Sequence, residues 1–197
     1  MMHPATEIRF VNVTVGHGVF ATEPIPAGTI VYVEDRLEIR LAEDDPLCQD
    51  PAYKSVIDRY AHEGAAGERI ICWDYAKYVN HCCHANSLST GWGFEIAIRD
   101  IAAGEEITDE YALFYRFEIP LACHHLDCRR VLQPAQDVAT YGRSWDSLVQ
   151  AALQHTAGVP QPLLPYLDAE TAVELRQYLE TGRGYRPLTP PDSRPAA

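Results

Sequence analysis

The sequence lacks the marks of a membrane-spanning or exported protein. No apolar run approaches the roughly 20 residues that are needed to span a bilayer. The opening residues, Met1 to Pro4, supply neither the basic nor the apolar part of a signal peptide. We therefore expect a cytoplasmic protein with no membrane partner, and its delivery to another compartment stays open.

The sequence also has few basic residues and no closely spaced pair of cysteines of the redox type. The chain has 16 basic residues, only two of them lysine, against 28 acidic ones, which gives a formal charge of −12. This acidity argues against a direct nucleic-acid partner and suits a basic protein or peptide, although an ordinary acidic surface is the alternative. The six cysteines form no C-x-x-C motif, which counts against a thiol-redox enzyme. In a chain that is not exported, reduced thiols or a metal site are expected rather than disulfides.

The chain does have enough apolar residues for one core. Its 197 residues, 47% of them hydrophobic, predict one domain or one domain with a small appendage. Alternating apolar residues predict strands near residues 10–15 and 37–41, and a half-buried strand over 94–98. Proline and glycine over residues 21–28 indicate a turn between strands.

Helices are predicted at three places. The first runs from Pro51 to about His62 with Asp50 as its cap, and a loop follows over 63–67. The second is capped by Ser144 and ends near residue 158, and the third runs from Asp168 to Gly182. The apolar faces of the last two should pack on the β-rich core.

Three short motifs carry residues suited to chemistry. Gly16-His17-Gly18 lets the backbone turn tightly and approach a ligand, although a plain turn explains such a triplet equally simply. Asn80-His81 brings an amide that can donate and accept hydrogen bonds, or else a polar turn that satisfies its own backbone. The third motif, residues 98–111, ends in Tyr111, one of 11 tyrosines that by itself reads as a packing residue.

In their order and spacing, these motifs resemble the SET family, whose best-known members transfer a methyl group from S-adenosylmethionine to lysine. Residues 77–86 are similar to the family pattern R-F-I-N-H-S-C-x-P-N, with identities at Asn80, His81, Cys83 and Asn86. Residues 98–111 resemble the strand, turn and tyrosine of A-x-R-D-I-x-x-G-E-E-L-T-x-D-Y. Cys82 replaces the serine, Ala85 the proline, and Glu110 the aspartate.

The resemblance implies roles for these residues. Tyr111 matches the catalytic tyrosine that closes the active site. Two residues earlier the family often has an aromatic residue that helps set how many methyl groups are added, and Asp109 stands there instead, so the product state is not carried over. The resemblance places the S-adenosylmethionine site on Gly16, His17, Gly18, Tyr78, Asn80 and His81.

A cysteine-containing stretch near residue 125 resembles the post-SET tail C-x-C-x4-C-R. In that tail three cysteines, together with the cysteine of N-H-S-C, bind zinc. Cys123, Cys128 and Cys83 match, but Leu121 stands at the first tail position, which leaves one thiolate fewer than a closed site needs. His124 or His125 could supply the fourth ligand. Alternatively, no metal binds and the cysteines pack as small apolar groups.

The resemblance also implies a fold and its limits. We expect a β-rich α+β fold of small curved sheets with a knot-like C-terminal threading, plus C-terminal helices. The SET domain with its partial post-SET segment would cover residues 8–130, with a variable insert over 42–76. A helical extension would follow over 131–187 and a disordered tail over 188–197.

Three hypotheses for the function follow from these motifs. The first is S-adenosylmethionine-dependent methyl transfer to the side-chain amine of a lysine in a protein substrate, such as a histone or another basic protein. The second is a catalytically inactive SET-like interaction module, which the missing tail cysteine, Asp109 and Glu110 favour. The third is a zinc or thiol-redox protein built on the cysteine pairs.

Overall fold

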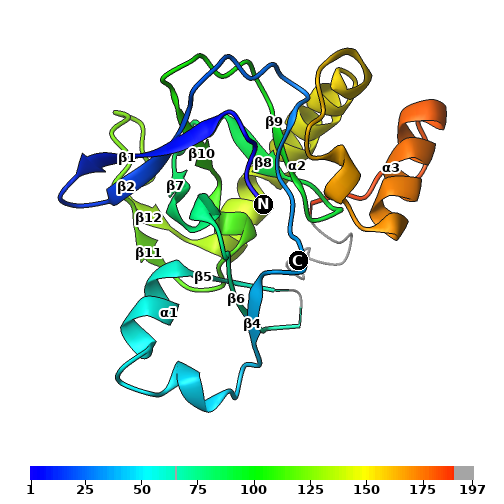
Figure 1. Ribbon diagram of the computed structural model, residues 1–197. Helices are drawn as coiled ribbons and strands as arrows, with labels where there is room; N and C mark the ends of the chain where they lie inside the picture. The colour runs from blue at the N-terminus through cyan, green and yellow to red at the C-terminus, as the bar shows by residue number, and fades with distance from the viewer. Residues whose placement is uncertain (65, 189–197) are drawn as a thin grey trace.

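The computed structural model describes residues 1–64 and 66–188. In this part of the chain the strands form four small sheets, and the two long helices lie together at one side of them (Figure 1). The strands are β1 (Thr6–Asn12), β2 (Gly16–Ala21), β3 (Ile30–Tyr32), β4 (Ile39–Leu41), β5 (Ala61–Glu63), β6 (Arg69–Ile71), β7 (Asn80–His81), β8 (Ser87–Ser89), β9 (Glu95–Ala97), β10 (Glu106–Asp109), β11 (Ile119–Pro120) and β12 (Val131–Leu132). The α-helices are α1 (Lys54–Tyr60), α2 (Pro134–Leu153) and α3 (Ala169–Thr181).

One sheet brings the three sequence motifs together. Its strand order is β1-β2-β10-β7, so the glycine-containing strand β2 pairs with β10, and β10 pairs with β7. The β10–β7 pairing is parallel and sets Thr108 beside Asn80 and Asp109 beside His81. A short 3₁₀ turn, Tyr111–Leu113, follows β10 directly. The residues of all three motifs therefore meet although more than 90 positions separate the first from the last.

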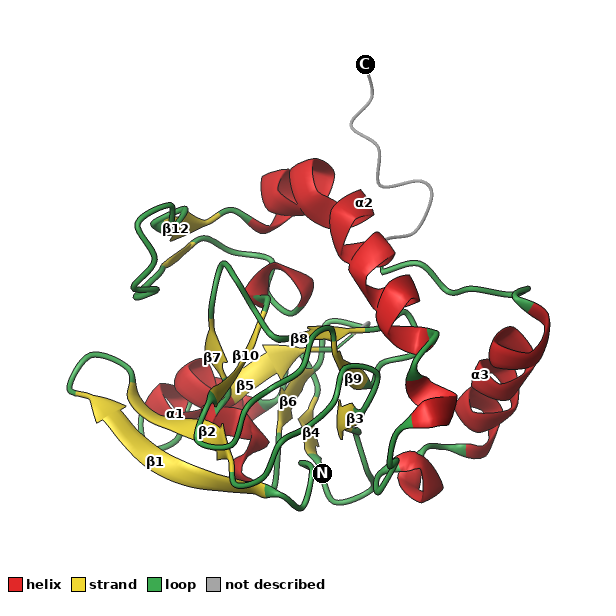
Figure 2. Cartoon of the chain, turned by 90° about the horizontal axis from the view of Figure 1, so that it is seen from above, coloured by secondary structure: helices red, strands yellow, loops and turns green. Residues whose placement is uncertain are grey.

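A second sheet, β3-β9-β8, carries the main core and receives the C-terminal helices. Ile30, Leu88 and Phe94 from this sheet region pack with Val149 and Leu153 of α2. Burying these apolar side chains is the main reason for the helices to dock. Figure 2 shows α2 running past the ends of β8 and β9, with α3 beyond it. The expected packing of the helices on the β-rich core is confirmed.

The remaining sheets are smaller. Strands β4, β6 and β5 form a three-stranded sheet with α1 beside it, and Leu41, Ile57 and Ala61 make its own small core. Strands β11 and β12 pair with each other just before α2. The first of these units lies apart from the helical side of the molecule (Figure 1).

Two predicted helices have different limits in the structure. The first is shorter than predicted, covering only Lys54–Tyr60, because Ala61–Glu63 leaves the helix to pair with β6. Glu63, the first residue of the predicted loop, therefore lies in strand β5 instead. The second begins ten residues before Ser144, at Pro134, where the Asp137 carboxylate accepts a hydrogen bond from the Gln133 amide at 2.9 Å. Ser144 lies inside this helix.

The third helix is confirmed with both of its caps. Asp168 accepts hydrogen bonds from the amides of Glu170 and Thr171, and Gly182 ends the helix with a φ of 68°. In the described residues no helix is long and apolar enough to cross a membrane. Nearly all of the predicted disordered tail, residues 189–197, lies outside the described residues. The knot-like threading and the domain limits stay predictions.

Candidate active site

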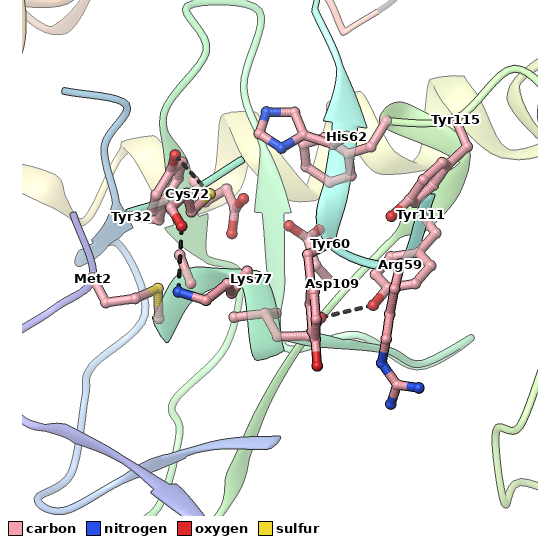
Figure 3. A pocket seen from close by; sticks show the side chains of 14 residues that line it. Met2, Tyr32, Arg59, Tyr60, His62, Cys72, Lys77, Asp109, Tyr111 and Tyr115 are labelled. Atoms are coloured by element: carbon pink, nitrogen blue, oxygen red, sulfur yellow. Dashed lines mark hydrogen bonds between the residues drawn. The ribbon is translucent and has the colours of Figure 1, made fainter. Parts of the chain in front are cut away.

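Tyr111 lines two cavities. The wider one, of about 360 Å³, is lined by His17, Tyr78, Asn80 and His81. The narrower one, of about 80 Å³, is lined by both aromatic and charged side chains (Figure 3). Both cavities are lined in part by Arg59, Tyr60, Lys77 and Tyr111. Four predicted cofactor residues and the predicted catalytic residue therefore line one cavity, whereas Gly16 and Gly18 are not among its lining residues.

The glycine motif shapes the wall of the wider cavity. Gly16 has a φ of +84°, a backbone conformation that favours glycine. A Cβ on Gly18 would lie 2.2 Å from Glu106 Oε1 and 3.0 Å from Asn80 Nδ2, so a larger residue would displace these two side chains. The turn and the close approach both favour glycine here.

Asn80 ties the glycine strand to β10. Its amide nitrogen donates hydrogen bonds to the His17 carbonyl at 3.0 Å and to Glu106 Oε1 at 2.7 Å. The rings of His17 and Tyr78 meet edge to face, with their centroids 5.9 Å apart. These contacts fix the wall between the glycine strand and the Asn80 segment, and they leave aromatic surface toward the cavity.

His81 holds the backbone of the tyrosine segment. The Tyr111 amide donates to His81 Nδ1 at 3.3 Å, and His81 Nε2 lies 3.5 Å from Cys83 Sγ. Burial and, after it, the charge of Arg129 lower the pKa of His81 to about 4. His81 is therefore neutral at pH 7, with Nδ1 free to accept the Tyr111 hydrogen bond.

The Tyr111 hydroxyl is a hydrogen-bond donor in this structure. It donates to the carbonyl of Val79 at 2.7 Å (Figure 3). Burial, and then the negative groups around it, raise the pKa of Tyr111 above its ordinary value. The phenol therefore stays protonated at neutral pH, and it can orient a neighbouring group but does not act as a resting base.

A buried ion-pair network anchors the tyrosine segment to the tail. Arg129 lies 2.6 Å from Glu110 and 3.0 Å from Asp137 of α2, and the side chains of all three are at most 14% exposed. The sequence pattern did not single out Arg129 or Asp137 as part of the site. The only signal was the arginine that follows Cys128 in the tail motif.

A pair of buried acids lines the narrower cavity. Glu95 and Asp109 are 9% and 2% exposed, and their carboxyl groups are hydrogen-bonded to each other. Burial raises the pKa of each, and the negative charge of Glu95 raises the pKa of Asp109 further. Sequence reasoning missed Glu95, because strand alternation placed it on the exposed face of a half-buried strand. The strand is in fact covered on both faces, with Ile96 and Ala97 also fully buried.

Four cysteines converge beside the tyrosine segment. Cys82 Sγ lies 3.9 Å from Cys123 Sγ, and Cys83 Sγ lies 3.8 Å from Cys128 Sγ. The predicted set Cys83, Cys123 and Cys128 is brought within 4.8 Å of one another, and all six cysteines of the chain are free thiols. Leu121 packs against this cluster.

Two further histidines stand near the cysteines. His125 falls within 4.8 Å of Cys82 and Cys123, and it also groups with His84 and Asp127 at the surface. His124 stacks on His125 but joins no such group among the described residues. Sequence reasoning treated Cys82 only as a replacement for serine. The structure makes it a member of the thiol cluster.

Comparison with known proteins identifies this arrangement. The family model for the SET domain matches residues 16–112. The chain contains a SET domain. The match begins at the glycine turn and ends one residue after Tyr111, so it takes in strands β2, β7 and β10, which join the three motifs. The predicted SET-type, β-rich fold is thereby confirmed.

The alignments with individual relatives cover only part of this SET protein. A Plasmodium falciparum protein named variant-silencing SET domain-containing protein is 32% identical over 126 residues, a match that covers 52% of this chain and 5% of that protein. A crystal structure from Plasmodium falciparum, described as that of a proposed histone methyltransferase, aligns with a TM-score of 0.42 and 18% identity. That alignment covers 56% of this chain and 95% of the other.

Proposed function

We propose that this SET protein transfers a methyl group from S-adenosylmethionine to the side-chain amine of a lysine in a protein substrate. One observation carries the proposal: Tyr111 lines both the wide cavity and the narrow one. In-line transfer needs a donor and an acceptor that approach one point from opposite sides. The wide cavity suits a nucleotide-sized cofactor, and the narrow one suits a single side chain.

The residues of the wide cavity fit the cofactor. Asn80 provides polar contact, and the rings of His17 and Tyr78 provide aromatic surface. S-adenosylmethionine supplies a methyl group on a positively charged sulfur, which needs no covalent nucleophile on the protein. The chain has then to hold the donor, exclude water and align the acceptor.

The narrow cavity fits a lysine side chain. Tyr32, Tyr60, Phe114 and Tyr115 line it and would cover the aliphatic part of the lysine. A free lysine has a pKa of about 10.4, and burial next to a cation lowers that value and favours the neutral, attacking amine. The protonated phenol of Tyr111 is placed to orient the reacting groups. The surplus of acidic residues agrees with a basic protein, such as a histone, as substrate.

The cysteine cluster fits zinc, with Cys82 in place of the missing tail cysteine. Sulfur atoms around a tetrahedral zinc lie about 3.8 Å apart, given bonds of about 2.3 Å. The Cys82–Cys123 and Cys83–Cys128 separations of 3.9 and 3.8 Å match two opposite edges of such a tetrahedron. Cys82 itself groups within 4.8 Å with Cys123 and His125 rather than with Cys83 and Cys128, so His125 is the alternative fourth ligand. Zinc there would fix the tail, whose residues 119–122 line the wide cavity.

Calorimetry and a transfer assay test the proposed function. Purified protein should bind S-adenosylmethionine and should label lysine in a core-histone mixture or a lysate supplied with isotopically labelled cofactor, as read by mass spectrometry. Tyr111→Phe should retain cofactor binding and lose most of the transfer. Absence of cofactor binding at millimolar concentration would refute the proposal. Binding with equal background transfer in both proteins would instead support the inactive interaction module.

A further inference from the structure

A second group of metal-ligating side chains lies at the surface beside the thiol cluster. It consists of His84, His125 and Asp127, each of which offers one ligand atom, and these three atoms all lie within 4.8 Å of one another. The sequence pattern suggested His124 or His125 only as a fourth ligand for the cysteines. It assigned nothing to His84 or Asp127, and the proposed methyl transfer uses neither.

Two segments of the chain supply the three side chains. His84 lies in the first segment, and its amide donates to Cys82 Sγ at 3.3 Å. His125 and Asp127 belong to one turn of the tail, which the Cys128 amide closes by donating to the His125 carbonyl at 3.1 Å. Because Cys82 and Cys128 both belong to the thiol cluster, that cluster holds the two segments against each other. The three ligands are therefore brought together by contacts that lie outside the group itself.

The spacing of these ligands fits direct coordination of a small divalent ion. Imidazole nitrogen and carboxylate oxygen bind zinc at about 2.0–2.2 Å, so two such atoms on one ion lie roughly 2.8–3.5 Å apart. His84 Nε2 lies 2.9 Å from each carboxylate oxygen of Asp127. The His125 ring lies alongside, with its centroid 4.3 Å from that of His84. The three groups therefore fit one coordination sphere.

A plain surface hydrogen bond explains only part of this arrangement. The side chains of His84 and Asp127 are 50% and 70% exposed, and an exposed pair of this kind contributes at most about 1 kcal/mol. Such a pair gives no reason for the second imidazole of His125 to lie against the first. A bound cation would use a lone pair of both imidazoles and the charge of the carboxylate. The formal charge of −12 also favours the approach of a cation.

The surroundings leave room for the remaining ligands of an ion. His84 and Asp127 line a cavity of about 210 Å³ beside α2. Arg129 lines the same cavity, but its guanidinium is paired with two buried carboxylates and is not the counter-ion of Asp127. Water can reach this place, and water commonly completes a metal site that has three protein ligands.

We propose that His84, His125 and Asp127 bind a divalent transition ion, as a second metal site beside the proposed thiolate zinc. Two imidazoles and one carboxylate suit zinc, cobalt or nickel, whereas calcium and magnesium take oxygen ligands. The ion is open to solvent, so dialysis removes it and the purified protein keeps only the zinc at the thiols. When bound, it ties the segment of His84 to the tail. The inference does not depend on methyl transfer.

Titration of the zinc-loaded protein with cobalt(II) tests the inference. Cobalt binds such ligands more weakly than zinc does, so it leaves the thiolate zinc in place. We expect one cobalt ion per chain, with visible d–d absorption and no thiolate charge-transfer band, because no sulfur is among its ligands. If the thiol cluster carries no zinc, the first cobalt ion enters that cluster and gives the band. The second ion then adds d–d absorption alone.

Substitutions identify the ligands. His84→Ala and Asp127→Ala should each weaken the binding of this cobalt ion at least about tenfold, a loss that even an outer partner of a metal ligand can cause. Both side chains are exposed, so these variants should fold. His125→Ala should lose the same ion and keep the thiolate zinc. His124→Ala is the matched control, because this neighbouring histidine joins no metal-binding group among the described residues, and it should bind cobalt as the wild type does.

Three outcomes would overturn the inference. The first is a wild type that binds no cobalt beyond the thiol cluster. The second is an unchanged cobalt affinity in His84→Ala and Asp127→Ala. The third is loss of zinc from His125→Ala, which would assign this histidine to the thiol cluster. A protein that transfers no methyl group refutes the proposed function and leaves each of these three readings as decisive as before.

Discussion

Replacing Arg129 by leucine tests how the tail holds the tyrosine segment. Arg129 is the only cation that the structure pairs with Glu110 and Asp137 among the described residues. The side chains of these acids are 3% and 9% exposed, so solvent cannot take over the role of the guanidinium. Burial alone already raises the pKa of Glu110, and Arg129 opposes that effect.

The expected loss follows from this burial. Removing one partner of a buried ion pair typically destabilises a protein by about 3–5 kcal/mol. For a chain of this length each kcal/mol lowers the melting temperature by roughly 2–4 °C. Arg129→Leu should therefore melt about 6–20 °C below the wild type. The loss should shrink toward acidic pH, where the stranded Glu110 can bind a proton.

Denaturant unfolding of a double-mutant cycle measures the pair itself. Glu110→Gln removes the charge that Arg129→Leu would strand, so the double variant should lose less stability than the two single losses added together. Arg99→Leu is the matched control, because its pair with Glu105 at 2.7 Å is half-exposed and worth at most about 1 kcal/mol. Equal losses for Arg129→Leu and Arg99→Leu would refute the assignment of Arg129 as a buried anchor.

Three further outcomes are expected. Burial lowers the pKa of His62 from 6.5 to about 4, so the unfolded chain binds a proton at higher pH than the folded chain does, and stability falls as the pH drops from 6.5 to 4. By pH 4 this loss is about 3 kcal/mol. His62→Gln should therefore flatten the pH dependence of the unfolding free energy, and an unchanged slope would contradict the burial. Gly18→Ala should weaken S-adenosylmethionine binding by calorimetry, because its Cβ would displace Glu106 and with it the Asn80 amide that lines the wide cavity, and unchanged affinity would place the cofactor elsewhere. Metal analysis should find one zinc per chain, which is lost in Cys82→Ala and kept in the control Cys48→Ala. Substitution of cobalt for zinc should give thiolate charge-transfer bands. If Cys82→Ala retains zinc, the fourth ligand is a histidine rather than Cys82.

Local chemistry in the sequence was sufficient for several features. Asp168 and Gly182 marked the limits of α3, because caps act through residues close in the chain. The order and spacing of the glycine turn, Asn80 and Tyr111 were enough to indicate the SET domain. These motifs work as signals because each one sets its own backbone geometry, whatever lies around it.

Other features depended on which distant segments meet. Strand alternation gave Glu95 an exposed face, and only the covering of β9 on both sides turned it into a buried acid beside Asp109. Cys82 gained its thiol neighbours, and Arg129 its two carboxylates, from residues that lie 8 to 41 positions away. Such neighbours are set by strand register and by the docking of the tail and α2. The sequence therefore determined which groups the chain carries and how each turns locally, whereas the tertiary structure decided which groups lost their water and which partner each one met.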